Sequence, residues 1–404
     1  VDSLDLCNGD TAVVDFTTSN GGVDSVTTYS WEITDGDSIF VGGALSDVGN
    51  INLPVINETN ADLVATITVT PTYTNDGVDC TGPSEEFTIT VSPTAQVEQV
   101  NDIVVCNGDE VAEIVFATTS ENDIAYSWSI DTEIGTQSLT GVGNIPLFEA
   151  DNDTNDPIVA IVTVTPSNDE TDPSLTCEGS SIEFTITVNP TAQVDLVDSL
   201  DLCNGDTAVV DFTTSNGGVD SVTTYSWEIT DGDSVFASAA LTGAGNINLP
   251  VANDTNADLV ATVTVTPTYT NDGVDCTGPS EEFTITVSPT AQVDQVDDIV
   301  VCNGDEVAEI VFATTSENDI AYSWSIDTEI GTQSLTGVGN IPLFEADNDT
   351  NDPIVAIVTV TPSNDETDPS LTCEGSSIEF TITVNPTAQV DLVDSLDLCN
   401  GDTA

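Results

Sequence analysis

The stretch Tyr29-Ser30-Trp31-Glu32-Ile33 decides the fold, because large apolar side chains alternate in it with polar ones. Alternation with a period of two places Tyr29, Trp31 and Ile33 on one face of a β-strand and the intervening residues on the other. Residues 63–69 and 87–91 alternate in the same way, and helical periodicity is absent. Short alternating runs separated by Asn, Gly, Asp and Pro clusters predict an all-β fold of immunoglobulin-like β-sandwiches.

The chain contains internal repeats. Residues 1–10 recur at 197–206 and at 393–402, which gives a period of 196 residues between Cys7 and Cys203. A half-repeat lies inside this period, because residues 106–109 match residues 7–10. Repetition of this kind indicates tandem domains, here of about 97 residues each. The expected domains are repeat A1 (1–93), repeat B1 (94–190), repeat A2 (191–289), repeat B2 (290–386) and the start of a fifth repeat (387–404), so we expect the sequence to be a window of a longer array.

The expected boundaries between domains are short and contain proline. They fall at 92–96, 189–191, 288–290 and 385–387, and none of them is rich in Gly or Ser. A short linker with proline and no flexible tract favours a semi-rigid connection. The sequence therefore predicts a linear rod of tandem sandwiches.

The charge of the chain excludes most functions. It has 71 Asp and Glu residues and no Lys, Arg or His, so its formal net charge is −71. Without His or Lys it lacks the usual general bases and Schiff-base amines, and we expect no enzyme activity and no organic cofactor. The same charge repels nucleic acid and anionic membranes, so neither is an expected partner. A hydrophobic content of 39% is nevertheless too high for a disordered polyanion.

The cysteines are spaced as one pair per domain. The natural pairing within each domain is Cys7 with Cys80, Cys106 with Cys177, Cys203 with Cys276 and Cys302 with Cys373, which leaves Cys399 as the odd one. Reduced buried thiols and metal ligation are the alternatives, and the latter lacks a nearby second sulfur or His. A disulfide closing such a loop stabilises a domain by roughly 4 kcal/mol in the chain-entropy model. Disulfides would also place the chain in an oxidising compartment.

One motif resembles a known family. Residues 29–37, Tyr-Ser-Trp-Glu-Ile-Thr-Asp-Gly-Asp, look like the Tyr-x-Trp-Asp-Phe-Gly-Asp-Gly signature of polycystic-kidney-disease (PKD) domains. The run 65–71, the late Cys80 and the closing run 87–93 resemble the PKD-like repeats of giant Bacteroidota surface proteins, which include gliding-motility adhesins exported by type IX secretion. The B repeats depart from the signature at residues 129–132. The resemblance implies a cell-surface protein with neighbouring repeats, surface polysaccharide or outer-membrane anchoring machinery as partners.

Two residue types are candidate binding sites. The tryptophans could stack on sugars, although their place between inward-facing apolar residues favours a core role; they are Trp31, Trp128, Trp227 and Trp324. Acidic clusters in turn-like stretches could hold calcium, the expected cation, with solvated turns as the alternative. The candidate calcium ligands are Asp35, Asp37, Asp76, Asp79, Asp151, Asp153 and Asp156, and none of them belongs to an EF-hand loop.

Two glycosylation patterns also occur. Asn-x-Thr appears at one equivalent loop of each repeat, at Asn57, Asn152, Asn253 and Asn348. The A repeats further carry Asp-Ser/Thr-apolar triplets, which resemble the O-glycosylation rule of Bacteroidota, and the B repeats contain none. The expected O-glycosylation sites are Ser3, Thr11, Ser25, Ser38, Ser199, Thr207, Ser221 and Ser234.

Together these features predict a mechanical role. The expected function is the stalk of a very long secreted adhesin or filament that holds a distal binding region away from the cell. One alternative is an S-layer or self-assembling sheath or fibre protein, and another is a set of calcium-dependent polysaccharide-binding repeats. Contacts between the sides of chains separate these alternatives, because a sheath protein needs them and a stalk does not.

Overall fold

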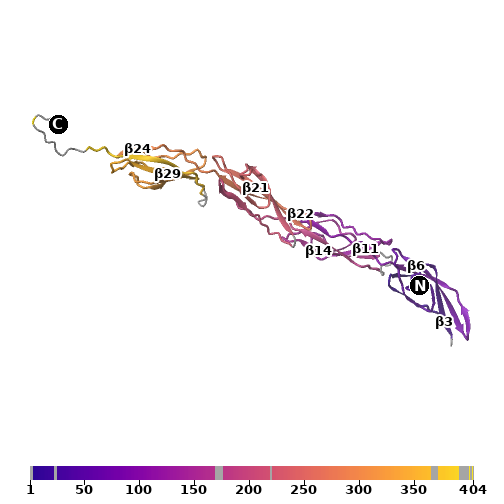
Figure 1. Cartoon of the computed structure of the whole chain (residues 1–404). Coiled ribbons are helices and arrows are strands. Elements are labelled where there is room, and N and C mark those ends of the chain that lie inside the picture. The colour runs from indigo at the N-terminus through magenta and orange to yellow at the C-terminus, as the bar shows by residue number, and fades with distance from the viewer. Residues whose placement is uncertain are drawn as a thin grey trace. The chain divides into compact units, whose positions relative to one another are not determined.

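The structure is a computed structural model that describes residues 3–21, 25–168, 176–218, 221–364, 372–390, 400 and 403. Cys399 and most of the expected fifth repeat lie outside these residues. Every regular element of the described part is a β-strand (Figure 1). The predicted all-β, immunoglobulin-like class is therefore confirmed. No helix of the described residues has the length and apolar character needed to cross a membrane.

Repeat A1 has two sheets. Its strands are β1 (Ser3–Cys7), β2 (Thr11–Val14), β3 (Val26–Gly36), β4 (Ser46–Val48), β5 (Ile51–Pro54), β6 (Leu63–Asn75), β7 (Val78–Thr81) and β8 (Glu85–Ser92). The large sheet has the order β1-β8-β6-β3-β4, with β7 paired to β6, and β2 pairs with β5 in the second sheet. The first strand runs parallel to the last, and the other pairs are antiparallel. This is the strand arrangement of an immunoglobulin-like sandwich.

The other repeats follow the same plan. Repeat B1 has β9 (Ile103–Cys106), β10 (Glu110–Val111), β11 (Ile124–Ile130), β12 (Thr140–Val142), β13 (Phe148–Glu149), β14 (Ile158–Asn168) and β15 (Ile182–Asn189). Repeat A2 has β16 (Leu200–Cys203), β17 (Thr207–Val210), β18 (Val222–Gly232), β19 (Thr242–Ala244), β20 (Ile247–Pro250), β21 (Leu259–Asn271), β22 (Val274–Thr277) and β23 (Glu281–Ser288). Repeat B2 has β24 (Ile299–Cys302), β25 (Glu306–Val307), β26 (Ile320–Ile326), β27 (Thr336–Val338), β28 (Phe344–Glu345), β29 (Ile354–Asn364) and β30 (Ile378–Asn385).

The chain divides into two compact units. Unit 1 contains Val1–Ala192, Asn216–Val222 and Tyr269–Thr277, and unit 2 contains the remaining residues. Unit 1 therefore holds repeats A1 and B1 together with three segments of repeat A2, residues 191–192, 216–222 and 269–277. Unit 2 holds the rest of repeat A2 and repeat B2.

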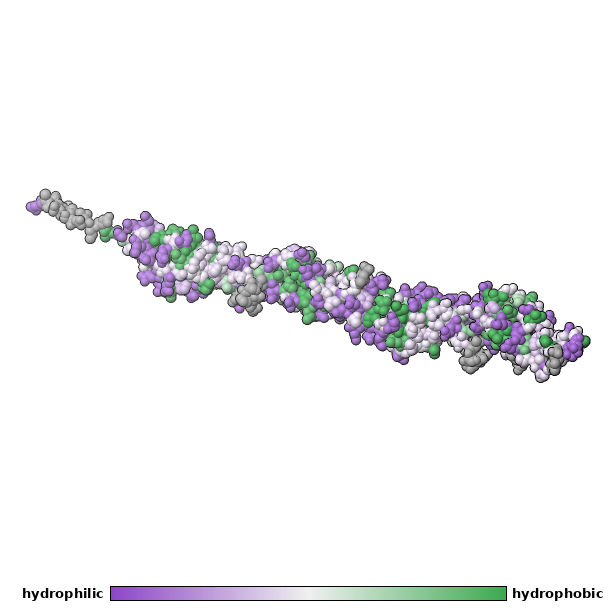
Figure 2. All heavy atoms as spheres, turned by 90° about the horizontal axis from the view of Figure 1, so that it is seen from below, coloured by the Kyte–Doolittle hydropathy of each residue, from purple (hydrophilic) through white to green (hydrophobic). Residues whose placement is uncertain are grey.

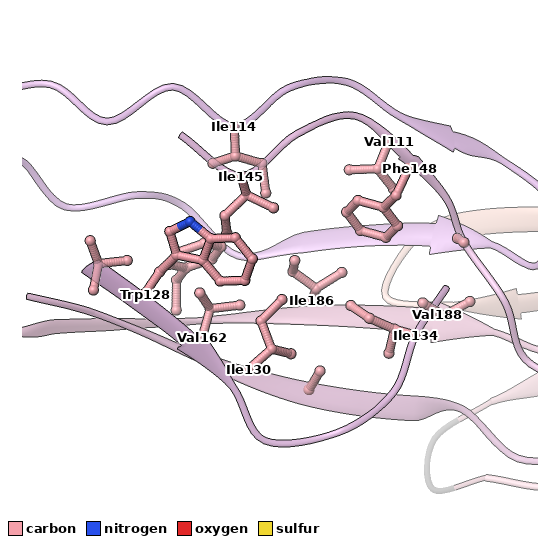
Figure 3. Close-up of a cluster of buried hydrophobic side chains, with 14 of the residues drawn as sticks. Val111, Ile114, Trp128, Ile130, Ile134, Ile145, Phe148, Val162, Ile186 and Val188 are labelled. Carbon is pink, nitrogen blue, oxygen red and sulfur yellow. The ribbon is translucent and has the colours of Figure 1, made fainter. Parts of the chain in front are cut away.

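Each sandwich has its own apolar core around its tryptophan. In repeat B1 the indole of Trp128 lies among Val162, which is on β14 of the large sheet, and Ile114 and Ile145, which pair in an isolated β-bridge (Figure 3). The four tryptophans are 2 to 7% exposed. The core role predicted for them is confirmed, since a ring buried to this degree offers no face to a sugar.

The strand directions give every sandwich two different ends. In repeat A1, β1 ends at Cys7 opposite Ser92, the last residue of β8, where the chain leaves toward the next repeat. Cys80 lies on β7 opposite Tyr73, close to the other end of the long strand β6. We call these the linker end and the far end of a repeat.

Candidate functional site: the junctions between repeats

The disulfides join neighbouring repeats. The described residues contain three of them, Cys7–Cys177, Cys106–Cys276 and Cys203–Cys373, each spanning 170 residues with Cα atoms 5.4 to 5.5 Å apart. Cys80 and Cys302 are free and exposed. The predicted pairing of Cys7 with Cys80, and the corresponding pairs in the other repeats, is therefore wrong. The cysteine at the linker end of one repeat bonds the cysteine at the far end of the next.

The strand register explains this correction. Leu63 pairs with Val91 next to the linker end, and Tyr73 pairs with Cys80 at the far end. Ten residues of β6 separate Leu63 from Tyr73, which is roughly 33 Å at 3.3 Å per strand residue. A disulfide needs Cα atoms within about 7 Å, so the two cysteines of one sandwich cannot reach each other.

A tight turn fixes the first cysteine of each pair. In the sequence Cys7-Asn8-Gly9-Asp10 the carboxylate of Asp10 accepts a 2.9 Å hydrogen bond from the Cys7 N–H, and the Asp10 N–H donates to the Cys7 carbonyl. Gly9 has a φ of 91°, a conformation that favours glycine. The same carboxylate bond recurs at Cys106, Cys203 and Cys302. The repeated Cys-Asn-Gly-Asp motif is therefore a device that positions the linker-end thiol.

The asparagine of this turn binds the linker. The side-chain amide of Asn8 donates to the hydroxyl of Thr94 at 3.0 Å, and its carbonyl oxygen accepts from the N–H of Asn57 at 2.8 Å. Asn107, Asn204 and Asn303 make the same two bonds in the other repeats. One side chain thus holds the turn, the loop before the sixth strand and the outgoing linker together.

The Asn-x-Thr loops belong to the same network. Asn57 is 1% exposed, and its amide nitrogen donates to the carbonyls of Ala61 and Val91. Its side-chain oxygen accepts from the N–H and the hydroxyl of Thr59. Asn152, Asn253 and Asn348 are 1 to 2% exposed and are bound in the same way. These asparagine side chains are buried and hydrogen-bonded and so have a structural role in the folded protein. The Asn-x-Thr motif in the sequence alone does not reveal this role.

The A-to-B junction adds polar contacts from the next repeat. Between A1 and B1 the amide of Asn168 donates to the carbonyl of Pro93 at 2.7 Å, and Asn122 donates to the carboxylate of Asp62 at 2.7 Å. In unit 2 the A2 and B2 repeats make the equivalent bonds from Asn364 and Asn318. A Cβ at Gly179 would lie 1.8 Å from the carbonyl oxygen of Ala95, so the linker backbone approaches this glycine closely.

The B-to-A junction in unit 1 uses different residues. Asn271 donates to the side-chain oxygen of Asn189 at 2.8 Å, and both side chains are buried. Tyr269 is 1% exposed and clusters with Ala192 and with Cys276, the partner of Cys106. Residues that lie most of a repeat apart in the sequence therefore pack into a small buried cluster around the Cys106–Cys276 disulfide.

The candidate calcium ligands do not form a cluster. Within the described residues, no three Asp, Glu, Cys or His side chains lie together in a way that could hold a metal ion. Asp79 accepts a hydrogen bond from the Thr74 hydroxyl at 2.7 Å, and Asp76 occupies a turn with a φ of 46°. Asp151, Asp153 and Asp156 are exposed residues of one loop. Asp35 and Asp37 lie at the end of β3 and just beyond it. Asp35 and Asp79 thus lie on strands and the other five residues lie in turns or loops, and among the described residues they do not form a calcium site.

Cations should still stabilise the protein through its charge. With no basic residue present, we expect calcium and magnesium to raise the unfolding temperature by similar amounts, and sodium at equal ionic strength to raise it less. Calorimetry with each chloride salt measures this. A midpoint that millimolar calcium leaves unchanged would contradict the expectation, and a much larger effect of calcium than of magnesium would indicate a specific site.

The candidate O-glycosylation hydroxyls lie in different settings. Ser3, Thr11, Ser38, Ser199 and Thr207 are exposed. Ser25, Ser221 and Ser234 are half-buried, and the hydroxyls of Ser221 and Ser234 donate to backbone carbonyls.

We propose that the exposed hydroxyls of the A repeats carry O-linked glycans and that the B repeats carry none, because only the A repeats have the triplet. Glycopeptide mass spectrometry of native protein should find hexose on A peptides alone. Sugar on both repeat types, or on neither, would remove the idea.

One carboxylate aligns the first and last strands of each B repeat. Asp102 accepts a 2.7 Å hydrogen bond from the Thr185 N–H, and Asp298 accepts the same bond from Thr381. This backbone hydrogen bond lowers the pKa of both carboxyls. A lowered pKa contributes stability that is present above the ordinary carboxyl range and is lost as the pH falls through the folded value. Both carboxyls are fully exposed, so their contribution to stability is confined to the contact between these two strands.

The chain is similar to solved structures that share little sequence with it. No protein-family model matches the chain, and no curated protein matches its sequence. Among solved structures it is similar to the human desmocollin-1 ectodomain, with 12% identity, a TM-score of 0.29, and coverage of 95% of this chain and 79% of that one. Drosophila N-cadherin EC1-4 has 12% identity, a TM-score of 0.25 and coverages of 96% and 99%. The insect immune protein hemolin has 9% identity, a TM-score of 0.26, and coverage of 96% of this chain and 98% of that one. The fold assignment rests on the strand order and pairing of this chain.

Proposed function

We propose that this chain is a load-bearing stalk of a very long secreted cell-surface adhesin or filament, of the type used in gliding motility. The observation that carries the proposal is the disulfide between each repeat and the next. Disulfides persist in oxidising compartments, which supports an extracellular location. The resemblance to PKD-like repeats supports a Bacteroidota surface protein exported by type IX secretion.

The covalent paths support a mechanical role. Tension applied to the two ends of the chain passes from Cys7 to Cys177 and from Cys203 to Cys373 through the sulfur atoms. Residues 8–176 and 204–372 therefore lie outside the shortest covalent path. The path itself contains residues 177–203, which are already the strand β15, a linker and the strand β16. One strand of each repeat (β1, β15, β16 or β30) lies on the path, and the bypassed remainder of each repeat cannot lengthen the chain while the disulfides hold.

The junction networks support stiffness. Each linker threonine is bound by the asparagine of the preceding turn. Like charges on all repeats oppose folding back, although salt screens them beyond about 8 Å. We therefore propose that the four repeats stand end to end as a rod.

Small-angle X-ray scattering tests this proposal. The longest strands have 13 residues, or about 43 Å at 3.3 Å per residue, so four sandwiches in line reach roughly 170 Å and have a radius of gyration of roughly 50 Å. A compact globule of 404 residues would have a radius of gyration of about 22 Å. A value near the compact one in the oxidised protein would contradict the stalk.

A further inference from the structure

The A repeats pack a phenyl ring against their tryptophan. In A1 the ring centroids of Phe40 and Trp31 are 5.4 Å apart, and Phe40 is 1% exposed. In A2 the centroids of Phe236 and Trp227 are 5.5 Å apart, and Phe236 is 3% exposed. The space on this side of the indole is therefore filled in both A repeats.

The B repeats have glycine at the position of this phenylalanine. Ile39 of A1 and Ile134 of B1 are equivalent, because the carbonyl of each accepts a hydrogen bond from the N–H of the residue just before the Asn-x-Thr asparagine. The next residue is Phe40 in A1 but Gly135 in B1, and repeat B2 likewise has Gly331. The B repeats thus lack the ring that packs against the indole in the A repeats.

A pocket of about 160 Å³ lies beside the tryptophan of each B repeat. In B1 its lining includes Trp128, Thr136, Leu147, Phe148 and Ile145, which lies next to the indole in Figure 3. The equivalent residues of B2 line the second pocket: Trp324, Thr332, Ile341, Leu343 and Phe344. None of the residues that line either pocket is charged, although the chain has 71 carboxylates.

Two polar groups of the lining lack a partner. Trp128 is 7% exposed and Thr136 is 8% exposed. Within the described part of the chain, neither the indole N–H of Trp128 nor the hydroxyl of Thr136 has a hydrogen-bond partner, and Trp324 and Thr332 repeat this in B2. The indole N–H lacks a partner in the A repeats too, so the threonine hydroxyl is what distinguishes the B pockets. Buried polar groups are normally hydrogen-bonded, and an exception calls for an explanation.

We propose that each B repeat binds one molecule of a small, neutral aromatic compound that carries a hydroxyl or carbonyl oxygen. An apolar cavity of about 150 Å³ holds one benzene molecule, so this pocket has room for a single ring. The oxygen of the ligand accepts a hydrogen bond from the indole N–H and forms a second one with the threonine hydroxyl. The ligand thereby takes the place of the phenyl ring of the A repeats and gives both polar groups a partner.

The charge of the chain restricts the ligand to neutral molecules. With a net charge of −71 and no Lys, Arg or His, the protein repels anions, and the uncharged lining offers a cation no carboxylate. A sugar is also a poor fit, because its many hydroxyls need more polar partners than the apolar side chains of Ile145, Leu147 and Phe148 supply. The inference concerns ligand binding, and it does not depend on the stalk function.

The pocket reaches the molecular surface. Leu147 of its lining is 58% exposed, and the equivalent Leu343 is 60% exposed. Hydrophobic residues occur on the surface as small patches among hydrophilic ones (Figure 2). A ligand can therefore enter from solvent while the sandwich stays folded.

The test follows the four indole N–H signals of the full chain by ¹H–¹⁵N NMR, since each repeat has one tryptophan. Single Trp→Phe variants assign the signals, and benzyl alcohol is the probe. The signals of Trp128 and Trp324 should shift with a dissociation constant of about 1 mM, as expected for a ligand of this size, and those of Trp31 and Trp227 should not. Equal shifts in A and B repeats, or unmoved B signals at about tenfold higher concentration, would overturn the proposal.

A variant tests the threonine. Thr136→Val removes the hydroxyl and keeps the branched shape, so it should weaken binding in B1 by about three- to tenfold and leave B2 unchanged in the same molecule. Thr132→Val is the matched control, because Thr132 is a half-buried residue of the same loop outside the lining. Equal affinities of B1 and B2 in Thr136→Val would refute the assigned recognition.

A charged probe tests the ligand class. Benzoate has the same ring and carries a negative charge, so it should bind at least about tenfold more weakly than benzyl alcohol. Binding of both probes with the same affinity would contradict a site for neutral compounds.

Discussion

Pulled from its two ends, the oxidised chain should show no unfolding of whole repeats, whereas the reduced chain should lengthen in steps of roughly 300 Å. Each step is the release of about 97 residues, roughly 320 to 350 Å at 3.3 to 3.6 Å per residue, less the roughly 40 Å that the folded repeat already spans. In the oxidised chain the bridges Cys7–Cys177 and Cys203–Cys373 remove residues 8–176 and 204–372 from the load path. The remaining residues contain no complete sandwich. Single-molecule force spectroscopy with handles at both termini measures the difference.

A variant that lacks one of the three disulfides is the matched control. Replacing Cys7 and Cys177 by serine places the body of repeat A1 back in the load path and leaves the other two disulfides in place. We expect the unfolding of A1 to return in that variant. Steps of full repeat length in the oxidised parent chain would show that the bridges do not carry the load.

Removing one buried asparagine should destabilise its repeat by about 3 kcal/mol, because buried groups left without partners cost about 1 to 3 kcal/mol each. Asn152 is 2% exposed, and its side chain binds the carbonyls of Asp156 and Val188 and the N–H of Thr154. Asn152→Ala leaves these backbone groups unpaired. About 3 kcal/mol corresponds to roughly a 100-fold increase in opening, at about 1.4 kcal/mol per factor of ten.

Hydrogen exchange followed by mass spectrometry measures this opening locally. A peptide that spans residues 152–168, and so contains both Asn152→Ala and β14, differs in mass from the otherwise identical peptide 348–364 of repeat B2, so B2 serves as a reference within the same molecule. Asp153→Asn is the matched control, since Asp153 is an exposed neighbour in the same loop. If repeats B1 and B2 of the Asn152→Ala variant were equally protected from hydrogen exchange, the side chain of Asn152 would not stabilise its repeat.

Much of the fold follows from the sequence alone. Alternation at Tyr29, Trp31 and Ile33 predicts a strand with its tryptophan in the core, and β3 has this form with Trp31 buried. Such a prediction succeeds because burial on a strand face depends on a period of two that the chain displays directly. The repeat period likewise follows from direct comparison of residues.

The spacing of the cysteines along the sequence does not determine how they pair. One pair per repeat fits Cys7 with Cys80 as well as Cys7 with Cys177, because every repeat supplies one cysteine of each kind. The choice depends on the parallel pairing of β1 with β8, which carries Cys7 to the linker end. A recurrent Cys-Asn-Gly-Asp turn followed by Asn-x-Thr was the available signal, since both motifs occur at the end of each sandwich where the linker leaves.

The most direct test of the cross-repeat bridges is the disulfide map of the oxidised protein. The chain has no Lys or Arg, but chymotrypsin cleaves after its aromatic residues and leucines and separates the four kinds of cysteine peptide. Non-reducing mass spectrometry should find the peptide 7–16, from Cys7, joined to the peptide 176–184, which contains Cys177. Joining of peptide 7–16 to peptide 74–87, which contains Cys80, would place the bridge inside one sandwich and contradict the account.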